Sequence, residues 1–512
     1  MFMIIERSSD WKEGFINKLE NQEPWDNWTL YNMSYEVVKA NLIEEFSGLQ
    51  SPKYLPNLTP LAHQLEVAET VISRMNGKAI LADEVGLGKT IEAGLILKEY
   101  LIRGLVKKVL ILAPASLINQ WVEELHYKFY IPAIAFKKNT PIDYYDVVVM
   151  SMDTAKKSPH KELIYAQNYD MIIIDEAHKL KNHKTKIYEF VQGLKKKFCL
   201  LLTATPVQNN VFELFYLISL LKPGHLGNYE TFQSSFSASK HSLEHDEYLR
   251  ELVNQVMVRN RREETGIEWT SRRVQTIPIE FTKEEREVYE LILELKNVSS
   301  VFSGAFSMIT LQKEMCSSKE ATYLTLTKMR QNCTTQAEID FVDGIIQKLM
   351  ALETNSKAEK AYEIISEAND KVIIFTEYKA SQVYLQWYLN SKGITSVPFN
   401  GQFNKSKREY MKHLFKEKFQ VLIATESGGE GINLQFCHHV INYDLPWNPM
   451  KLEQRIGRVH RLGQEHDVHI YNLAIENTIE KDILELLYVK LDVFEKVVGE
   501  LDDILSTLKK TI

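Results

Sequence analysis

One glycine-rich run early in the chain has the composition of a phosphate-binding loop. The run precedes a helical pattern over Ile91–Tyr100 and reads Asp83-Glu84-Val85-Gly86-Leu87-Gly88-Lys89-Thr90. Glycines allow the backbone to close around phosphates, so that backbone N–H groups and a helix N-terminus face the anion. The lysine ammonium would reach the β- and γ-phosphates of a nucleotide, and the threonine hydroxyl would ligate Mg²⁺. Because Asp83 occupies the position of the pattern's first glycine, a purely structural turn is the alternative at this point.

An acidic pair farther along the chain is the second candidate for chemistry. Asp175 and Glu176 follow the apolar run Met171–Ile174, which is typical of a buried strand. In open α/β sheets, ligands bind beyond the carboxyl ends of the strands. Asp175 would hold Mg²⁺ there, and Glu176 would polarise the attacking water. Taken alone, such a pair is more often a solvated loop, but together with the phosphate loop it indicates nucleotide hydrolysis.

A row of arginines near the end of the chain is the third candidate. Arg455, Arg458 and Arg461 are spaced at i, i+3 and i+6, so on a helix they would share roughly one face. Such a row can be a solvated surface, and by itself that is the commoner case. In a protein that also has a phosphate loop, these residues become candidate arginine fingers, which can contribute about 10³–10⁵ in rate.

Two stretches of the chain, 58–224 and 356–475, alternate helical patterns with short apolar runs. In the first stretch the runs are Lys78–Ala82, Val109–Ala113, Val147–Ser151, Met171–Ile174 and Phe198–Thr203. In the second they are Lys371–Thr376, Val421–Ala424 and His439–Asn442. This alternation predicts an α/β fold with two lobes, each a parallel sheet covered by helices on both faces.

The remaining three stretches are predicted to be helical. Residues 1–57 form an N-terminal extension whose three tryptophans are expected to pack on the first lobe rather than to stack on bases. Residues 225–355 are poor in strand signals and predict helical protrusions and a linker. Two capping boxes are expected at helix starts, one at Thr282 with Glu285 and one at Ser356 with Glu359. Residues 476–512 predict a C-terminal helix that braces apolar surface, with a docking site for a partner as the alternative.

The composition of the chain excludes several other classes of protein. It has 512 residues, a formal net charge of −7 and four cysteines, none of them in a CxxC pair, so neither a disulfide framework nor a zinc-binding Cys cluster is indicated. No apolar run approaches the roughly 18 residues that a membrane span needs. We therefore expect a cytoplasmic protein with no membrane partner, on which any basic surface is local. Lysine is concentrated between Lys179 and Lys197, which is most often solvated surface and less often a phosphate-contacting face.

Taken in order, the motifs resemble those of the SWI/SNF-type ATPases of helicase superfamily 2, and most closely the bacterial RapA/HepA-like branch. The resemblance covers about residues 58–475, and an aspartate at the head of the phosphate loop is usual in that family. The matching segments are Thr59–Gln64, Asp83–Thr90, Asp175–His178, Thr203–Pro206, Ile373–Tyr378, Thr425–Leu434, Asn442–Pro449 and Gln454–Gln464.

The resemblance implies roles for individual residues in two RecA-like lobes. Gln64 would read adenine and thereby favour ATP, while Arg458 and Arg461 would complete the site from the second lobe. A basic element that the family carries matches Arg259, Arg261 and Arg262. The residues that would couple nucleotide state to nucleic acid are Thr203, Thr205, Thr425, Gly429, Asn433 and Gln454.

The function that the resemblance implies is an ATP-dependent double-stranded DNA translocase, with ATP and Mg²⁺ as cofactors. It would remodel or displace DNA-bound proteins without processive strand separation, in the bacterial cytoplasm and in some cases at the nucleoid. A strand-separating DNA or RNA helicase and an ATP-regulated nucleic-acid scaffold are the alternatives. RapA-type proteins bind RNA polymerase, but the roughly 57 residues before the Gln64 motif are too few for two folded domains. We therefore expect no tight polymerase binding through an N-terminal module.

Overall fold

The computed structural model describes residues 10–21, 27–41, 48–137, 140–204, 206, 212–236, 243–298, 305–429 and 432–487. The chain divides into two compact units, Met1–Leu49 and Gln50–Ile512. The first unit contains helices α1 (Asp10–Glu20) and α2 (Trp28–Asn41). Trp28 is 72% exposed and its ring stacks on that of Tyr31, with ring centroids 5.1 Å apart. The packing of the N-terminal tryptophans on the first lobe stays a prediction, and Trp25 lies outside the described residues.

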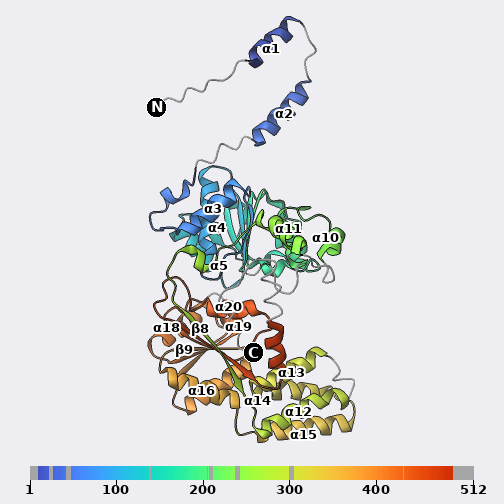
Figure 1. The fold of residues 1–512 in the computed structure, drawn as a ribbon, viewed down its shortest axis with the longest axis vertical. Helices are drawn as coiled ribbons and strands as arrows, with labels where there is room; N and C mark the ends of the chain where they lie inside the picture. Colours follow the sequence, from blue (N-terminus) through green and yellow to red (C-terminus); the bar gives the residue numbers. More distant parts are fainter. Residues whose placement is uncertain are drawn as a thin grey trace. The chain divides into compact units, whose positions relative to one another are not determined.

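The larger unit begins with a lobe built on a parallel sheet, which has seven strands among the described residues (Figure 1). Its order is β3-β4-β2-β5-β6-β1-β7. The strands are β1 (Lys78–Leu81), β2 (Val109–Ala113), β3 (Ala133–Ala135), β4 (Val147–Ser151), β5 (Met171–Asp175), β6 (Phe198–Leu202) and β7 (Met257–Val258). The five strands predicted for 58–224 are confirmed to within one residue at their ends, because their apolar side chains are buried on both faces of the sheet.

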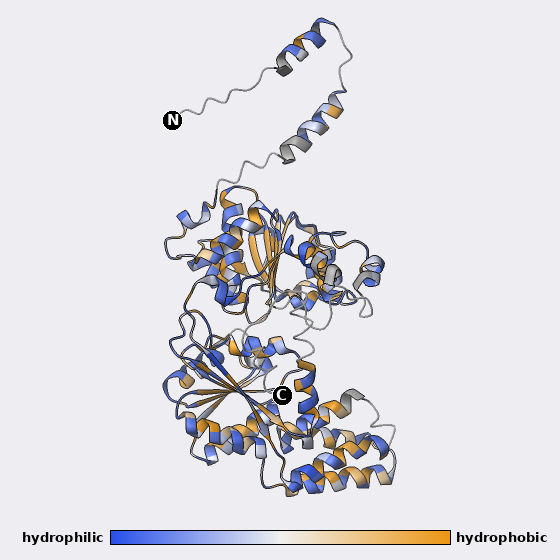
Figure 2. Cartoon of the chain, in the orientation of Figure 1, coloured by the Kyte–Doolittle hydropathy of each residue, from blue (hydrophilic) through white to orange (hydrophobic). Residues whose placement is uncertain are grey.

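Helices flank this sheet and carry many hydrophilic residues, whereas the strands are mainly hydrophobic (Figure 2). The longer ones are α3 (Ala62–Ser73), α4 (Lys89–Ile102), α5 (Ile118–Tyr127), α9 (Phe212–Leu221) and α11 (Leu243–Asn254). The shorter ones are α6 (Met152–Ala155), α7 (His160–Ala166), α8 (Lys186–Gln192) and α10 (Tyr229–Phe236). Four 3₁₀ turns complete the set: η1 (Ser51–Tyr54), η2 (Ile142–Tyr144), η3 (Ala177–Leu180) and η4 (Arg262–Thr265).

A second lobe is built on another parallel sheet, with six strands in the described part of the chain. Its order is β10-β11-β9-β12-β13-β8. The strands are β8 (Arg272–Ile279), β9 (Val372–Thr376), β10 (Ser396–Phe399), β11 (Val421–Thr425), β12 (His439–Asn442) and β13 (Val468–Ile475). The helices are α12 (Lys283–Val298), α13 (Ala305–Ser317), α14 (Lys319–Gln331), α15 (Gln336–Ala351), α16 (Ser356–Ala368), α17 (Lys379–Ser391), α18 (Lys405–Glu417), α19 (Glu426–Gly429) and α20 (Pro449–Ile456).

The described residues of the stretch 225–355 are mostly helical, and they also contribute one strand to each sheet. Strand β7 pairs with β1 of the first sheet, and β8 pairs with β13 of the second over its whole length. Six apolar residues of this stretch belong to the core of the first lobe: Leu226, Phe232, Leu249, Val253, Val256 and Met257. Helices α12–α15 pack against one another and share an apolar core with the second sheet. The predicted domain boundaries at 224 and 355 therefore cut through the two lobes.

One of the two predicted capping boxes is present. The Thr282 hydroxyl accepts from the Glu285 amide at 3.2 Å, and the Glu285 carboxylate accepts from the Thr282 amide at 2.9 Å. The box expected at Ser356 is wrong, because Asn355 caps α16 by accepting from the Ala358 amide at 2.8 Å. The Ser356 hydroxyl donates instead to the Glu285 carboxylate, which ties the start of α16 to α12.

Residues 479–487 are helical and pack on the second lobe, and residues 488–512 of the expected C-terminal brace lie outside the described residues. Ile483 and Leu487 are buried in a cluster with Leu445, Leu452 and Ala474. At the start of this helix Glu480 forms a buried ion pair with Lys357 of α16. Among the described residues, no helix combines the length and the apolar character that crossing a membrane requires.

Candidate active site

The glycine-rich run lies between β1 and α4, as the sequence predicts, and its glycines adopt conformations that other residues rarely adopt. Gly86 has φ +101° and Gly88 has φ +98°. A Cβ on Gly88 would lie 2.6 Å from Gln64 Nε2, so a larger residue would displace the glutamine side chain. The loop therefore presents backbone rather than side chains in front of the α4 N-terminus, which is the arrangement that binds phosphate.

Two side chains at the start of α3, those of Gln64 and His63, contact the backbone of this loop. Gln64 Nε2 donates to the Leu87 carbonyl at 2.8 Å, and Gln64 Oε1 accepts from the Leu61 amide at 3.0 Å. The ring of His63 contacts the same Leu87 carbonyl at 3.2 Å through Nε2. The residue that the resemblance assigns to adenine recognition is thus in direct contact with the phosphate loop.

The Lys89 ammonium is folded back onto its own loop. Its Nζ donates to the carbonyl of Asp83 at 2.5 Å and to that of Glu84 at 3.1 Å. These two carbonyl oxygens accept hydrogen bonds that the ammonium would donate to phosphate oxygens when a nucleotide is bound. The charge of Lys89 acts on both members of the acidic pair: it opposes the rise in the pKa of Asp175 that burial causes, and it adds to the effect of His178 and Arg458 in lowering the pKa of Glu176, so the lysine and the acidic pair share one site.

A buried carboxyl pair lies beneath the loop. Both oxygens of Asp83 accept hydrogen bonds from Asn260, at 2.8 Å from the backbone amide and 3.0 Å from the side chain. Burial, together with the neighbouring charge of Asp83, raises the pKa of Glu92 well above its usual range. The ligand atoms of His63, Asp83 and Glu92 lie within 4.8 Å of one another, as in a metal site. Because Asp83 is satisfied by Asn260 and Glu92 favours its protonated form, the cluster is better described as a structural support for the loop.

The acidic pair at the end of β5 has two different electrostatic environments. Burial and the neighbouring Glu176 raise the pKa of Asp175 to about 6, against the opposing hydrogen bond that Trp121 Nε1 donates to it at 2.8 Å. Burial would also raise the pKa of Glu176, but the hydrogen bond from His178 and the charges of His178, Arg458 and Lys89 outweigh it and lower the pKa to about 2. Glu176 is therefore a carboxylate at neutral pH.

These residues fit a nucleotide with its Mg²⁺. The two loop glycines have positive φ angles that leave backbone rather than side chain at the start of α4, and Asp175 offers a partly buried carboxylate that hydrogen bonds from Trp121 and the Glu176 amide hold in place. Thr90 is the second residue of α4, where its hydroxyl could join Asp175 as a hard oxygen ligand. Lys89 and the loop amides could hold the phosphates.

The arginine row does not run along one helix, contrary to the sequence-based expectation. Helix α20 ends at Ile456, and residues 457–459 form a turn. Arg455 is buried within the second lobe, where its Nη1 donates to Asn442 Oδ1 at 3.1 Å and to the Asp444 carbonyl at 2.8 Å. Arg455 therefore supports the end of β12, and the turn separates it from Arg458 and Arg461.

Arg458 and Arg461 do lie against the first lobe. Arg458 and Gln454 line a small cavity of about 30 Å³ that they share with Glu176. A Cβ on Gly86 would lie 3.7 Å from the Arg461 Cα, so the phosphate loop faces the backbone of this arginine. Burial and the charge of Arg458 lower the pKa of Arg461 to about 10, so Arg461 remains a cation at neutral pH.

Arg262 bridges the two lobes at this point, a contact that the sequence did not reveal. Its Nη2 donates to the Val85 carbonyl in the phosphate loop, and its Nη1 contacts Nδ1 of His460 at 3.2 Å. His460 Nε2 donates to the Thr270 carbonyl at 2.9 Å, which leaves Nδ1 as the acceptor. Burial and the charge of Arg272 lower the pKa of His460 to about 4, so the ring is neutral. The only signal in the sequence was the basic run around Arg262, which gave no contact partner.

The residues expected to couple nucleotide state to nucleic acid are distributed over the two lobes. Thr203 is buried beside the loop, and its amide donates to the Leu81 carbonyl at 3.0 Å. Thr425 is the buried last residue of β11, Gly429 ends α19, and Asn433 is exposed. Thr205 lies outside the described residues.

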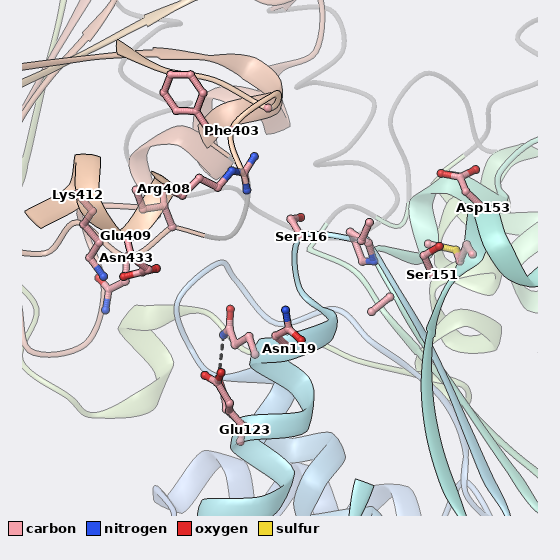
Figure 3. A pocket seen from close by; sticks show the side chains of 18 of the residues that line it. Ser116, Asn119, Glu123, Ser151, Asp153, Phe403, Arg408, Glu409, Lys412 and Asn433 are labelled. Carbon is pink, nitrogen blue, oxygen red and sulfur yellow. Dashed lines mark hydrogen bonds between the residues drawn. The ribbon is translucent and has the colours of Figure 1, made fainter. Parts of the chain in front are cut away.

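A large cleft of about 840 Å³ opens between the lobes beside this site. The first lobe contributes Ser116, Asn119 and Ser151, and the second lobe contributes Arg408, Lys412 and Asn433 (Figure 3). Arg461 lines the same cleft. Hydroxyl, amide and cationic side chains of this kind contact nucleic-acid backbones.

Comparison with known proteins identifies the two lobes. A family model for the SNF2-related domain matches residues 63–338, and one for the helicase conserved C-terminal domain matches residues 356–463. The chain is 59% identical to the uncharacterized ATP-dependent helicase YqhH of Bacillus subtilis over 98% of this chain and 90% of that protein.

More distant matches agree with this assignment. The RNA polymerase-associated protein RapA of Actinobacillus pleuropneumoniae is 28% identical over 85% of this chain, but the match spans only 50% of RapA. The Pyrococcus furiosus Hef helicase domain has the same fold, with a TM-score of 0.50 and 18% identity over 83% of this chain and 97% of that one. The chain therefore belongs to the SNF2-related family of helicase superfamily 2 ATPases, built from two RecA-like lobes.

Proposed function

We propose that this protein is an ATP-dependent translocase on double-stranded DNA that remodels or displaces DNA-bound proteins without processive strand separation. The proposal rests on Arg461, which both faces the phosphate loop and lines the large cleft. Its backbone faces the phosphate loop, and the same residue lines the cleft of about 840 Å³. A change in how the lobes meet around the nucleotide would therefore also change the cleft.

The chemistry proposed for the site follows from its charges. ATP bound with Mg²⁺ supplies the phosphoanhydride bond whose hydrolysis drives movement. Lys89 exchanges its two loop carbonyls for phosphate oxygens, and Thr90 with Asp175 holds the metal. Glu176, with a pKa of about 2, is a carboxylate that orients the attacking water by accepting its hydrogen bond. Arg458 and Arg461 stabilise the negative charge that develops on the transferred phosphoryl group.

The lining of the cleft supports binding to a nucleic-acid backbone. Helix α18 carries Arg408 and Lys412 toward it, while the loop after β2 brings Ser116 and the start of α5 brings Asn119 from the opposite lobe. Aromatic platforms, which single-strand binders use to stack bases, are scarce among the lining residues that the structure describes. Phe399 is buried, and the Lys407 ammonium lies 4.1 Å from the centre of the Phe403 ring. These features favour a duplex that is held by its phosphates.

The proposal is tested by measuring ATP hydrolysis with duplex DNA, single-stranded DNA, RNA and no nucleic acid. Duplex DNA should stimulate ATP hydrolysis more than single-stranded DNA or RNA does. This stimulation should fall steeply with added salt, because protein binding to the DNA phosphates releases counterions. A double variant, Arg408→Ala with Lys412→Ala, should need at least tenfold more duplex for half-maximal stimulation. Lys416→Ala on the same helix, which is exposed and does not line the cleft, is the matched control. Stimulation by RNA alone, or an unaffected double variant, would contradict the proposal.

Association with RNA polymerase is a separate question. RapA is named for that association, but the match to RapA covers half of its length. We propose that this chain, acting in the bacterial cytoplasm, makes no tight polymerase contact through residues 1–49. A pull-down with purified core polymerase tests this, because stoichiometric binding that is lost on deleting residues 1–49 would show the opposite.

A further inference from the structure

One buried carboxylate of the second lobe joins several elements that are distant in sequence. Asp444 lies just after β12, at the carboxyl end of the strand, and is 1% exposed. Its Oδ2 atom accepts hydrogen bonds from the Thr376 hydroxyl at 2.6 Å, the Glu377 amide at 2.9 Å and the Ser317 hydroxyl at 3.1 Å. Thr376 ends β9 and Ser317 ends α13. Because a buried polar network with its hydrogen bonds made is rigid, Asp444 is held at a fixed point between these elements.

Two further buried charges lie beside Asp444. The Lys357 ammonium of α16 is 4.0 Å from Asp444 Oδ1 and forms an ion pair with Glu480, which belongs to the helix 479–487. All three side chains are at most 2% exposed. Burial alone would lower the pKa of Lys357, but the charges of Glu480 and Asp444 outweigh it and raise that pKa, so the lysine is a cation. Lys357 therefore balances the charge of Asp444 at the oxygen other than the one that accepts the three hydrogen bonds.

The backbone of Asp444 is in contact with the segment that carries the arginines. Its carbonyl accepts from Arg455 Nη1 at 2.8 Å, which holds the buried guanidinium in place. The Arg455 carbonyl in turn accepts from the Arg458 amide at 3.1 Å, and Arg461 Nε donates to the Gly457 carbonyl at 2.7 Å. A displacement of Asp444 would therefore move Arg455 and, with it, the start of the turn that carries Arg458 and Arg461.

We propose that Lys357 and Asp444 are positioning residues for ATP hydrolysis, which fix Arg455 and thereby the turn that presents Arg458 and Arg461 to the first lobe. This role rests on the function proposed above for the last two arginines. A misplacement of about 1 Å at a reacting centre can cost about 10²-fold in rate. Such a loss lowers kcat and leaves ATP affinity almost unchanged, because the phosphate loop belongs to the other lobe.

The alternative is that the buried charges only stabilise the fold, and variants of the ion pair separate the two roles. Removing Lys357 alone leaves two buried carboxylates without their cation, which destabilises a protein strongly. Replacing a whole buried ion pair by apolar residues of similar size is often neutral for stability. The double variant Lys357→Met with Glu480→Leu should therefore keep the fold, while Asp444 still loses its neighbouring cation.

The experiment measures thermal unfolding, ATP affinity and ATP hydrolysis with and without duplex DNA in the full chain. The double variant should melt at a higher temperature than Lys357→Met and bind ATP within about threefold of wild type, but its kcat should be lower by about tenfold or more. Asp444→Asn removes the charge, keeps the shape and should lower kcat to a similar extent. This single variant keeps the test decisive if the double variant does not fold.

An exposed ion pair on the same helix supplies the matched control, since Lys360→Met with Glu363→Leu should match wild type in all three measurements. Wild-type kcat in both the double variant and Asp444→Asn would overturn the positioning role and leave the proposed function standing. A loss of ATP affinity as large as the loss of kcat would also overturn it. Arg461→Ala, measured beside them, tests the proposed function itself, because near-normal hydrolysis in that variant would overturn both.

Discussion

Hydrolysis depends on individual side chains whose charge is set by their immediate neighbours. Asp175 and Glu176 are consecutive and both partly buried, yet the pKa of one is raised to about 6 and that of the other is lowered to about 2. The difference arises because His178, Arg458 and Lys89 stabilise the charge of Glu176, whereas Asp175 lies next to a like charge. The sequence could predict both residues from the strand that precedes them, but it could not predict which of them would hold a proton more tightly.

The first prediction separates nucleotide binding from turnover. Glu176→Gln should abolish ATP hydrolysis, with at least a 10³-fold loss, while leaving ATP affinity within about threefold of wild type, because Asp175 remains as a metal ligand. Lys89→Ala should weaken ATP binding as well, since a cation that contacts phosphate is lost. Fluorescent-nucleotide binding measured beside steady-state hydrolysis distinguishes the two effects. Substantial turnover in Glu176→Gln would show that another residue orients the water.

The second prediction concerns stability and pH at a residue far from the nucleotide. Burial raises the pKa of Glu314 in α13 to about 7, above its value in the unfolded chain. The folded state therefore holds the proton more tightly, so the stability contributed by protonated Glu314 is present at pH 4 and lost as pH rises through 7. Glu314→Gln should raise the free energy of unfolding by about 1–3 kcal/mol at pH 8 and have little effect at pH 4.

Denaturant titrations at the two pH values measure this difference. Glu294→Gln, an exposed glutamate of the neighbouring helix α12, is the control and should have no effect at either pH. Equal stabilisation by Glu314→Gln at both pH values would show that burial does not raise the pKa of Glu314.

Strands and helices were predicted most accurately from the sequence where their pattern was both local and apolar. Strands such as β2 and β4 were found because every residue is buried. Strand β8 was missed because it lies at a sheet edge, alternates in burial and contains Pro278, while β7 has only two residues. The arginine row was misplaced for a different reason, since a spacing of three residues cannot reveal that α20 stops at Ile456.

The bridge between the lobes leads to the third prediction. Arg262 contacts both the phosphate loop and His460, so it favours the arrangement in which Arg458 and Arg461 meet the first lobe. Hydrogen bonds that involve a charged group contribute about 1.5–3 kcal/mol each. Arg262→Ala should therefore lower DNA-stimulated hydrolysis by about tenfold or more with little change in ATP affinity.

Two variants sharpen this test. Arg273→Ala removes an exposed arginine whose ion pair with Asp467 lies within the second lobe, and it should hydrolyse ATP like wild type. Gly457→Ala should reproduce the defect, because a Cβ there would overlap Val85 Cγ1 of the phosphate loop. Normal hydrolysis in Arg262→Ala would mean that the lobes meet productively without this bridge.

At the scale of the whole molecule, the two lobes have parallel sheets and form the site only together. Loop and acidic residues come from the first lobe and arginines from the second, while the cleft of about 840 Å³ is lined by both. The order of the motifs allowed the family to be predicted from the sequence. The contacts of Arg262 with Val85 and His460 join residues that are distant in sequence and carry no local pattern.

The central claim, movement along duplex DNA driven by the two-lobe ATPase, is tested most directly by displacement of a triplex-forming third strand from a duplex. We expect that wild type displaces the third strand only when ATP is hydrolysed, that Glu176→Gln and Arg461→Ala do not, and that a forked duplex stays paired under the same conditions. A third strand that remains bound while the forked duplex is efficiently unwound would contradict the central claim.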